Sequence, residues 1–146
     1  MNILKNLLAG FAGAFALNVL HEGLKNTSPD MPRIDLVGEE ALNKVLSSFG
    51  AAISSEKKLY QATLATDVFS NALYYSLIGA GSNKFIVSRA VVSGLSAGLG
   101  AVNLPDKIGL DDEPVTKTSK TKVLTVAYYL SGALVTAIVL KALNKK

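Results

Sequence analysis

A few polar and ionisable side chains interrupt long apolar stretches of this sequence, and these residues could do chemistry. Asp67 and Asn71 lie four residues apart in one such stretch, and His21, the only histidine among the 146 residues, precedes Glu22 at the end of another. A carboxylate within a membrane is costly, so it normally faces a bundle interior or a wet cavity and has a partner. Histidine can exchange a proton near neutral pH. We therefore expect these side chains to gather at one polar site.

Several chemistries fit the residues of that site. The candidates for binding a solute or an ion are Asn18, His21, Glu22, Arg33, Asp67, Asn71, Asn103 and Tyr128. The candidate ligands of one divalent metal ion are the imidazole of His21 and the carboxylates of Glu22, Asp67 and Asp106. His21 and Asp67 could also act as a base and its orienting group in a hydrolase, or as a proton relay in a transporter. The alternative is that these groups only join helices, through hydrogen bonds worth on average about 0.6 kcal/mol each.

Two familiar catalytic patterns do not fit the sequence. The zinc-binding HExxH motif is not present, and a serine triad using Ser70 would need a strand-turn-helix elbow that the sequence does not predict. Arg33 and Asp35 could pair and fold the first loop over the polar residues as a lid. The planar guanidinium of Arg33 also suits a phosphate or a carboxylate. No cofactor is indicated.

The elements that must position these residues are four apolar stretches, at residues 3–22, 59–81, 85–104 and 123–143. Each approaches the ~20 residues that a helix needs to cross a hydrocarbon core of about 30 Å. We therefore predict an all-α fold, a four-span transmembrane helix bundle running up-down-up-down, as a single domain over residues 1–146. Because only a short turn joins the second and third spans, we expect those two helices to be antiparallel neighbours.

An extra amphipathic helix is predicted in the first loop, at residues 38–54. Apolar residues recur there at helical spacing. They are Ala41, Leu42, Val45, Leu46, Phe49 and Ile53. The segment is too short and too polar to span a membrane, so we expect it to lie along the membrane surface or to cap the bundle.

The predicted threading gathers the polar residues at one end of the bundle. The first and third loops share that end, and the candidates on all four spans lie within one or two turns of a common depth. Asn103 and Asp106 close the third span, and Tyr128 lies within two turns of the third loop. This common depth is the strongest functional signal in the sequence.

Small residues in the third span indicate close helix packing. Gly94 and Gly98 form the small-xxx-small pattern that lets helix backbones approach in lipid. Gly10 and Ala14 offer a similar surface on the first span. The pattern fits packing within the monomer, and it also fits the seam of a homo-oligomer through Gly94 and Gly98.

Composition and charge support a membrane location. Apolar residues make up 49% and charged residues 18%, against about 25% charged in an average soluble protein. Cysteine is absent, so the chain has no disulfide and no thiolate zinc site. Both ends of the chain are basic without any acid, as in segments that anchor to anionic lipid headgroups. We expect a lipid bilayer as partner and no nucleic acid, because no basic-aromatic platform accompanies the charges.

The predicted location is integral to a membrane, of the bacterial inner or plasma membrane type. Lysine and arginine number nine at the end with the first and third loops and six at the end with the termini. Those counts favour termini outside the cytoplasm. The net charge of the two ends favours the reverse, and on that basis we place the termini in the cytoplasm.

The leading functional hypothesis is a transporter or channel for a small solute or ion that binds at the polar site. A second hypothesis is a membrane-embedded enzyme, either a metal-assisted or a His/Asp hydrolase, that acts on a lipid-like substrate. The third is a structural subunit of a larger membrane complex. The sequence does not choose the substrate.

Overall fold

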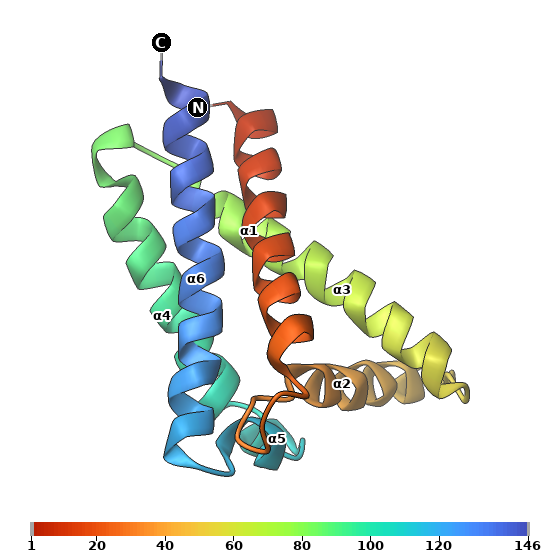
Figure 1. Cartoon of the computed structure of the whole chain (residues 1–146). Helices are drawn as coiled ribbons and strands as arrows, with labels where there is room; N and C mark the ends of the chain where they lie inside the picture. Colours follow the sequence, from red (N-terminus) through yellow and green to blue (C-terminus); the bar gives the residue numbers. More distant parts are fainter. Residues whose placement is uncertain (1, 146) are drawn as a thin grey trace.

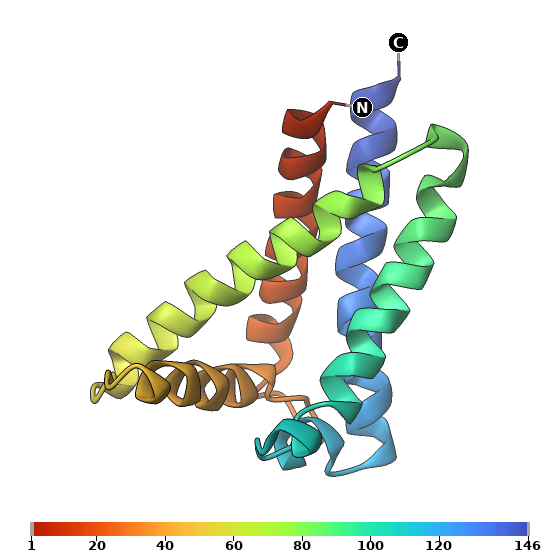
Figure 2. The same cartoon turned by 180° about the vertical axis from the view of Figure 1, so that it is seen from behind.

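The computed structural model describes residues 2–145, which form helices joined by turns (Figures 1 and 2). The α-helices are α1 (Ile3–Leu24), α2 (Ile34–Ser48), α3 (Glu56–Ser76), α4 (Ile86–Asn103), α5 (Glu113–Thr116) and α6 (Ser119–Asn144). Short 3₁₀ turns are η1 (Leu77–Gly79), η2 (Asn83–Phe85) and η3 (Asp106–Ile108). No strand occurs in the described part of the chain, which confirms the all-α prediction.

Side-chain caps explain where three long helices begin. The Asn2, Ser55 and Thr118 side chains accept hydrogen bonds from backbone N–H groups in the first turns of α1, α3 and α6. Such caps satisfy N–H groups that have no partner within the helix. Ser55 and Thr118 therefore start α3 and α6 a few residues before the apolar stretches that predicted them.

Three helices are long and apolar enough to cross a membrane, judged by length and composition. They are α1, the segment Asn83–Asn103 that combines η2 with α4, and α6. The predicted span at residues 59–81 is not among them. The matching helix, α3, carries seven polar side chains besides its tyrosines within this stretch: Gln61, Thr63, Thr66, Asp67, Ser70, Asn71 and Ser76. The structure thus supports three of the four predicted spans as candidates.

The long helices pack in the spatial order α3, α1, α6, α4. α6 contacts both α1 and α4 along its length, and α1 contacts α3. Figures 1 and 2 show α3 running obliquely away from α4, from their shared turn towards α2. The prediction that these two helices are neighbours is therefore wrong. Although their connection is short, each packs on a different helix, and a hydrogen bond from the Tyr74 hydroxyl to the Ser93 carbonyl (3.0 Å) bridges them.

The two ends of the bundle have different contents. The loop-one end holds α2, α5 and the loops that flank them, and the terminal end holds both chain termini and the turn at residues 77–86 (Figure 1). This separation agrees with the predicted sharing of one end by the first and third loops.

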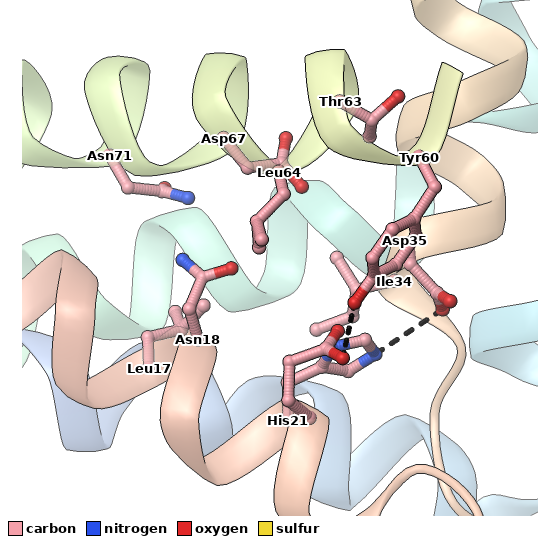
Figure 3. Close-up of a pocket in the computed structure, with 11 residues that line it drawn as sticks. Leu17, Asn18, His21, Ile34, Asp35, Tyr60, Thr63, Leu64, Asp67 and Asn71 are labelled. Atoms are coloured by element: carbon pink, nitrogen blue, oxygen red, sulfur yellow. Dashed lines mark hydrogen bonds and ion pairs between the residues drawn. The ribbon is translucent and has the colours of Figure 1, made fainter. Parts of the chain in front are cut away.

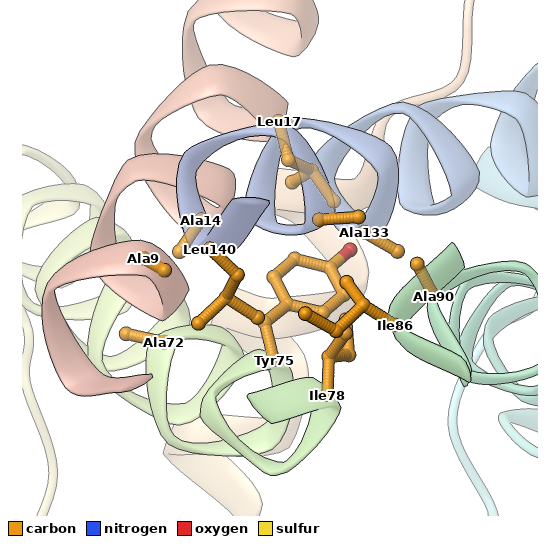
Figure 4. Close-up of a cluster of buried hydrophobic side chains, with 11 residues drawn as sticks. Ala9, Ala14, Leu17, Ala72, Tyr75, Ile78, Ile86, Ala90, Ala133 and Leu140 are labelled. Atoms are coloured by element: carbon orange, nitrogen blue, oxygen red, sulfur yellow. The ribbon is translucent and has the colours of Figure 1, made fainter. Parts of the chain in front are cut away.

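Small side chains make up much of the helix interfaces. The buried cluster in Figure 4 surrounds Tyr75 and includes Ala9, Ala14, Ala72, Ala90, Ala133 and Ala137. A Cβ added to Gly94 or Gly98 would lie 2.7 Å from the Leu130 Cα or 2.6 Å from the Val126 Cα. These two glycines therefore let α4 approach α6 within one chain. A second copy could use the same atoms only if α6 moved away.

Large apolar side chains lie on the outside of the long helices. On α1 these exposed residues are Ile3, Leu4, Leu8, Phe11, Phe15 and Val19, and on α4 they are Val87, Val91, Val92, Leu95 and Leu99. Contiguous exposed apolar surface of this kind is unusual on a soluble monomer. Helices in lipid typically pack closely through small residues and turn their large apolar side chains outward. This pattern and the three candidate spans are consistent with a membrane location.

The extra helix exists, but its bounds differ from the prediction. α2 starts at Ile34 and ends at Ser48, instead of covering residues 38–54. It lies across the loop-one end, at a steep angle to α1 and α6 (Figure 2). Gly38 lies inside this helix, where its lack of a side chain lets α2 approach α3. A Cβ added to Gly38 would lie 2.8 Å from the Thr63 methyl group.

Candidate functional site

Polar groups from α1, α2 and α3 meet around a small cavity at the loop-one end (Figure 3). This polar cavity has a volume of about 10 Å³. It is lined by Leu17, Asn18, His21, Glu22, Ile34, Asp35, Tyr60, Thr63, Leu64, Asp67 and Asn71. Such a volume holds roughly one water molecule. Five of the predicted binding residues line it: Asn18, His21, Glu22, Asp67 and Asn71.

Helical spacing explains how α3 contributes to the cavity. Tyr60, Thr63, Asp67 and Asn71 follow one another at intervals of three or four residues, so they share one face of the helix. That face is turned to α1, whose Asn18, three residues before His21, points to Asn71 across the gap (Figure 3). The same spacing could have identified Tyr60 and Thr63 from the sequence.

His21 lies between two carboxylates. Its Nδ1 is 3.3 Å from Glu22 Oε1, and its Nε2 is 3.4 Å from Asp35 Oδ1. The second pair is close enough to be an ion pair but is not aligned as a hydrogen bond, so Nε2 has no regular partner in the described chain. The ring is 3% exposed and packs edge-on against Tyr128, with centroids 6.3 Å apart. His21 is therefore held in place from three sides.

Lys25 links the acids of this group to α3. Its Nζ lies 2.9 Å from Glu22 Oε2, 3.3 Å from Asp35 Oδ2 and 3.3 Å from the Tyr60 hydroxyl, which in turn donates to Glu22. Burial lowers the pKa of Lys25, but hydrogen bonds to Glu22 and Tyr60 outweigh it and raise the pKa above its ordinary value. Lys25 was not predicted as a site residue, although it follows His21 by one helical turn.

Asp35 is the centre of the network. The Arg33 guanidinium donates to it twice, from Nε to Oδ1 at 2.9 Å and from Nη2 to Oδ2 at 2.7 Å. This bidentate contact confirms the predicted Arg33–Asp35 pair. Burial raises the pKa of Asp35, but the contacts with His21 and Arg33 lower it by more than burial raises it. The pKa of Asp35 therefore lies well below its ordinary value. Asp35 thus stays charged, and the sequence did not reveal that His21, Lys25 and Arg33 all share it.

Asp67 differs from Glu22 and Asp35, the other acids of the polar cavity, because it forms no hydrogen bond or ion pair with residues 2–145. An added Cβ at Gly38 would lie 3.3 Å from its Oδ2, so the carboxylate reaches the α2 backbone. It also lines a second space of about 140 Å³, the inner cavity. The other lining residues there are Ile34, Val37, Gly38, Ala41, Ala101, Pro105, Val115 and Tyr129. Asp67 therefore stands between the polar cavity and an apolar one.

A larger apolar space opens where α3 and α4 diverge. This lateral cleft, of about 450 Å³, is lined by Val37, Asn71, Tyr74, Ser96, Ala97, Gly100, Ala101, Leu104, Pro105, Ile108, Leu110 and Tyr129. Four residues line both the cleft and the inner cavity: Val37, Ala101, Pro105 and Tyr129. The two spaces therefore adjoin, and Asp67 lies at the inner side of the combined volume.

Four of the predicted residues do not line the polar cavity: Arg33, Asn103, Asp106 and Tyr128. Asn103 is exposed on α4 and its Nδ2 donates to the Leu99 carbonyl at 2.7 Å. Asp106 is exposed on η3. Tyr128 lies behind His21, with its hydroxyl 3.6 Å from the sulfur of Met31.

The described residues give no arrangement that supports the metal or the hydrolase hypothesis. Within residues 2–145, no group of three or more histidine and acidic side chains is arranged to hold a metal ion. His21, Glu22 and Asp67 line one cavity, but Asp106 is not with them. Ser70, the serine weighed as a nucleophile, is exposed and donates to the Thr66 carbonyl, so it does not face His21.

No protein family, no curated protein and no solved structure matches this chain. Its function must therefore be inferred from the residues themselves.

Proposed function

We propose that this chain is a membrane transporter for an amphipathic cation, which it binds through Asp67 with the apolar part in the lateral cleft. The observation that carries the proposal is the unpartnered carboxylate between a polar and an apolar space. A largely buried charge needs a counter-charge or hydrogen-bond donors. Since no described side chain supplies one to Asp67, a ligand with a positive group would complete the site.

The walls of the cleft favour an organic cation over a metal ion. Tyr74 and Tyr129 line it together with two alanines, Pro105 and branched apolar residues. Aromatic faces attract quaternary ammonium groups, and apolar walls accept the rest of such a molecule. A hydrated inorganic ion would gain little from these surfaces.

The position of Asp67 supports a carrier more than an open channel. On one side of it the lateral cleft opens between α3 and α4, and on the other side the polar cavity leads towards the charged loop-one end. The polar cavity has room for only about one water molecule. A solute would therefore have to bind and be passed on by a movement of α2 or α3.

Binding of octyltrimethylammonium to the full chain in lipid nanodiscs tests the proposal. This probe keeps its charge at every pH, and octanesulfonate provides the same chain length with the opposite charge. We expect the protein to bind the cation and to reject the anion. Asp67→Asn should weaken cation binding at least tenfold and abolish its flux in vesicles.

Two further variants separate a specific site from general attraction. Glu56→Gln removes the same charge from an exposed position on the same helix, and it should bind like the wild type. Ala101→Leu narrows the wall shared by the cleft and the inner cavity without a change of charge, and it should also weaken binding. Equal affinity of Asp67→Asn and wild type would refute the proposal.

A further inference from the structure

A second polar cavity lies at the terminal end, far from the site around His21 and Asp67. This amide cavity has a volume of about 450 Å³. It is lined by Asn2, Asn6, Gly79, Gly81, Asn83 and Asn144. The lining residues come from the start of α1, the turn between α3 and α4, and the end of α6. Figures 1 and 2 show these segments gathered beside the two termini.

Asn6 is the most informative residue of the amide cavity. It is only 9% exposed, yet its carboxamide has no hydrogen-bond partner among residues 2–145. Gly79 makes room for it, because a side chain there would collide with the Asn6 carboxamide. A buried amide without a partner loses stability unless water or a ligand satisfies it. The Asn6 carboxamide is therefore available to water or to a ligand in the cavity.

The amides present donors to such a ligand. Asn144 Nδ2 donates to Asn83 Oδ1 at 3.3 Å, and Asn2 Oδ1 accepts from the Lys5 backbone N–H at 3.2 Å. These contacts use the carboxamide oxygens of Asn83 and Asn2. Their NH₂ groups, like that of Asn6, have no acceptor in the described chain. Three neutral donor groups thus face a space without an acidic side chain.

The charges around the cavity select an anion. Every ionisable side chain described at the terminal end is basic: Lys5, Lys84, Arg89, Lys141 and Lys145. The helices α1 and α4 both begin at this end, and helix N-termini carry partial positive charge. The C-terminal ends of α3, continued by η1, and of α6 also lie here, but Arg89 Nε donates to the Ile78 carbonyl and Lys5 Nζ donates to the Leu143 carbonyl. An oxyanion with several acceptor oxygens would satisfy both the amides and the positive field.

We propose that the amide cavity binds a phosphate group, supplied either by the headgroup of an anionic lipid or by free phosphate. The cavity lies at the end of three candidate membrane spans, where lipid headgroups would meet the protein if these helices cross a bilayer. Phosphate offers acceptors in several directions, which matches donors that come from three different segments. This site is independent of the cation site proposed at Asp67.

Lipid retention by the full chain tests the phosphate site. The protein is purified in detergent with equal amounts of phosphatidylglycerol and phosphatidylcholine, and bound lipid is counted by native mass spectrometry. We expect phosphatidylglycerol to be preferred, because the choline ammonium of the other lipid meets the basic side chains. The double variant Asn83→Ala/Asn144→Ala keeps every charge and should lower the affinity for phosphatidylglycerol about tenfold, the effect of losing one charge-assisted hydrogen bond.

The matched control is Asn26→Ala, which makes the same change at an exposed position of the loop-one end and should retain lipid like the wild type. Titration with inorganic phosphate, followed by phosphorus NMR, distinguishes the two sources. Binding of phosphate alone identifies free phosphate, and retention of lipid alone identifies the headgroup. If the double variant retains as much phosphatidylglycerol as the wild type and neither protein binds phosphate, the lysines attract lipid without a site and the proposal fails. Thermal unfolding of each variant confirms that it is folded, and Asn83→Ala alone replaces the double variant if needed.

Discussion

At the loop-one end, side chains of both charges contact one another, whereas at the terminal end every described charge is positive and three amides have no acceptor. His21, Lys25 and Arg33 all reach the carboxylate of Asp35. At the terminal end the nearest equivalent is one hydrogen bond between the amides of Asn83 and Asn144. The first arrangement joins helices and leaves little for a ligand. The second leaves the NH₂ groups of Asn2, Asn6 and Asn83 without an acceptor among residues 2–145.

Asp67 is an exception among the acids of the polar cavity at the loop-one end. It lines the same cavity as Asp35, but it takes no part in the network of contacts. The two carboxylates therefore allow one comparison inside the same site, since Asp35 contacts three basic side chains and Asp67 has no hydrogen bond or ion pair with residues 2–145.

The largest effect on stability should come from Asp35→Ala. The side chain is 7% exposed and contacts three basic groups, so its removal takes the paired acid from Arg33 and leaves Glu22 as the acid beside Lys25 and His21. Breaking a buried pair in this way costs about 3–5 kcal/mol. Thermal or denaturant unfolding in detergent measures the loss. A variant as stable as the wild type would show that the network does not hold α2 to α1.

The pH dependence of unfolding sharpens the same point. The pKa of Asp35 is lower in the folded protein than in the unfolded chain. The ionised Asp35 side chain therefore contributes its full stabilisation above the ordinary aspartate pKa of about 4. That stabilisation is lost as the pH falls from about 4 towards the pKa of Asp35 in the folded protein. The wild type should therefore lose stability below about pH 4. Asp35→Asn lacks this titration. The difference between the melting temperatures of the wild type and of Asp35→Asn should therefore become smaller as the pH is lowered from 5 to 3. A gap that stays constant would contradict the assignment.

The sequence predicted depth along the helices better than their arrangement around the bundle. Hydropathy and spacing correctly brought Asn18, His21, Glu22, Asp67 and Asn71 to one level and one cavity. Asn103 is also near the loop-one end, but it lies on α4, which α6 separates from α1. The order in which helices pack depends on contacts such as Gly94 against Leu130, and no local pattern in one helix specifies which helix will be its partner.

The network around Asp35 was hard to predict for a related reason. Its members come from the end of α1, the start of α2 and the start of α3, and the loop at residues 25–33 must fold back before they meet. The pair of Arg33 and Asp35 was visible because it is local. The contacts of Asp35 with His21 and Lys25 depend on the path of that loop.

A smaller loss is expected for Tyr60→Phe. The change removes the hydroxyl that donates to Glu22 and receives Lys25, but it keeps the ring, which lies 4.5 Å below the Lys25 ammonium. One such hydrogen bond contributes about 1 kcal/mol. Unfolding in the same detergent measures it, with Tyr60→Leu as the control that removes the ring as well. Equal stability of Tyr60→Phe and wild type would mean that the hydroxyl does not help to join α3 to α1.

The smallest effect on stability, and the most decisive comparison, belongs to Asp67→Asn. Because Asp67 has no described partner, removing its charge breaks no contact and relieves the cost of burying a carboxylate. We expect the variant to be as stable as the wild type within about 0.5 kcal/mol, or more stable. Asp35→Asn, the same chemical change in the same cavity, should be clearly destabilising. If Asp67→Asn proved equally damaging, both acids would be structural, and the binding role proposed for Asp67 would lose its basis. A variant that folds as well as the wild type but no longer binds the cation would separate the two roles.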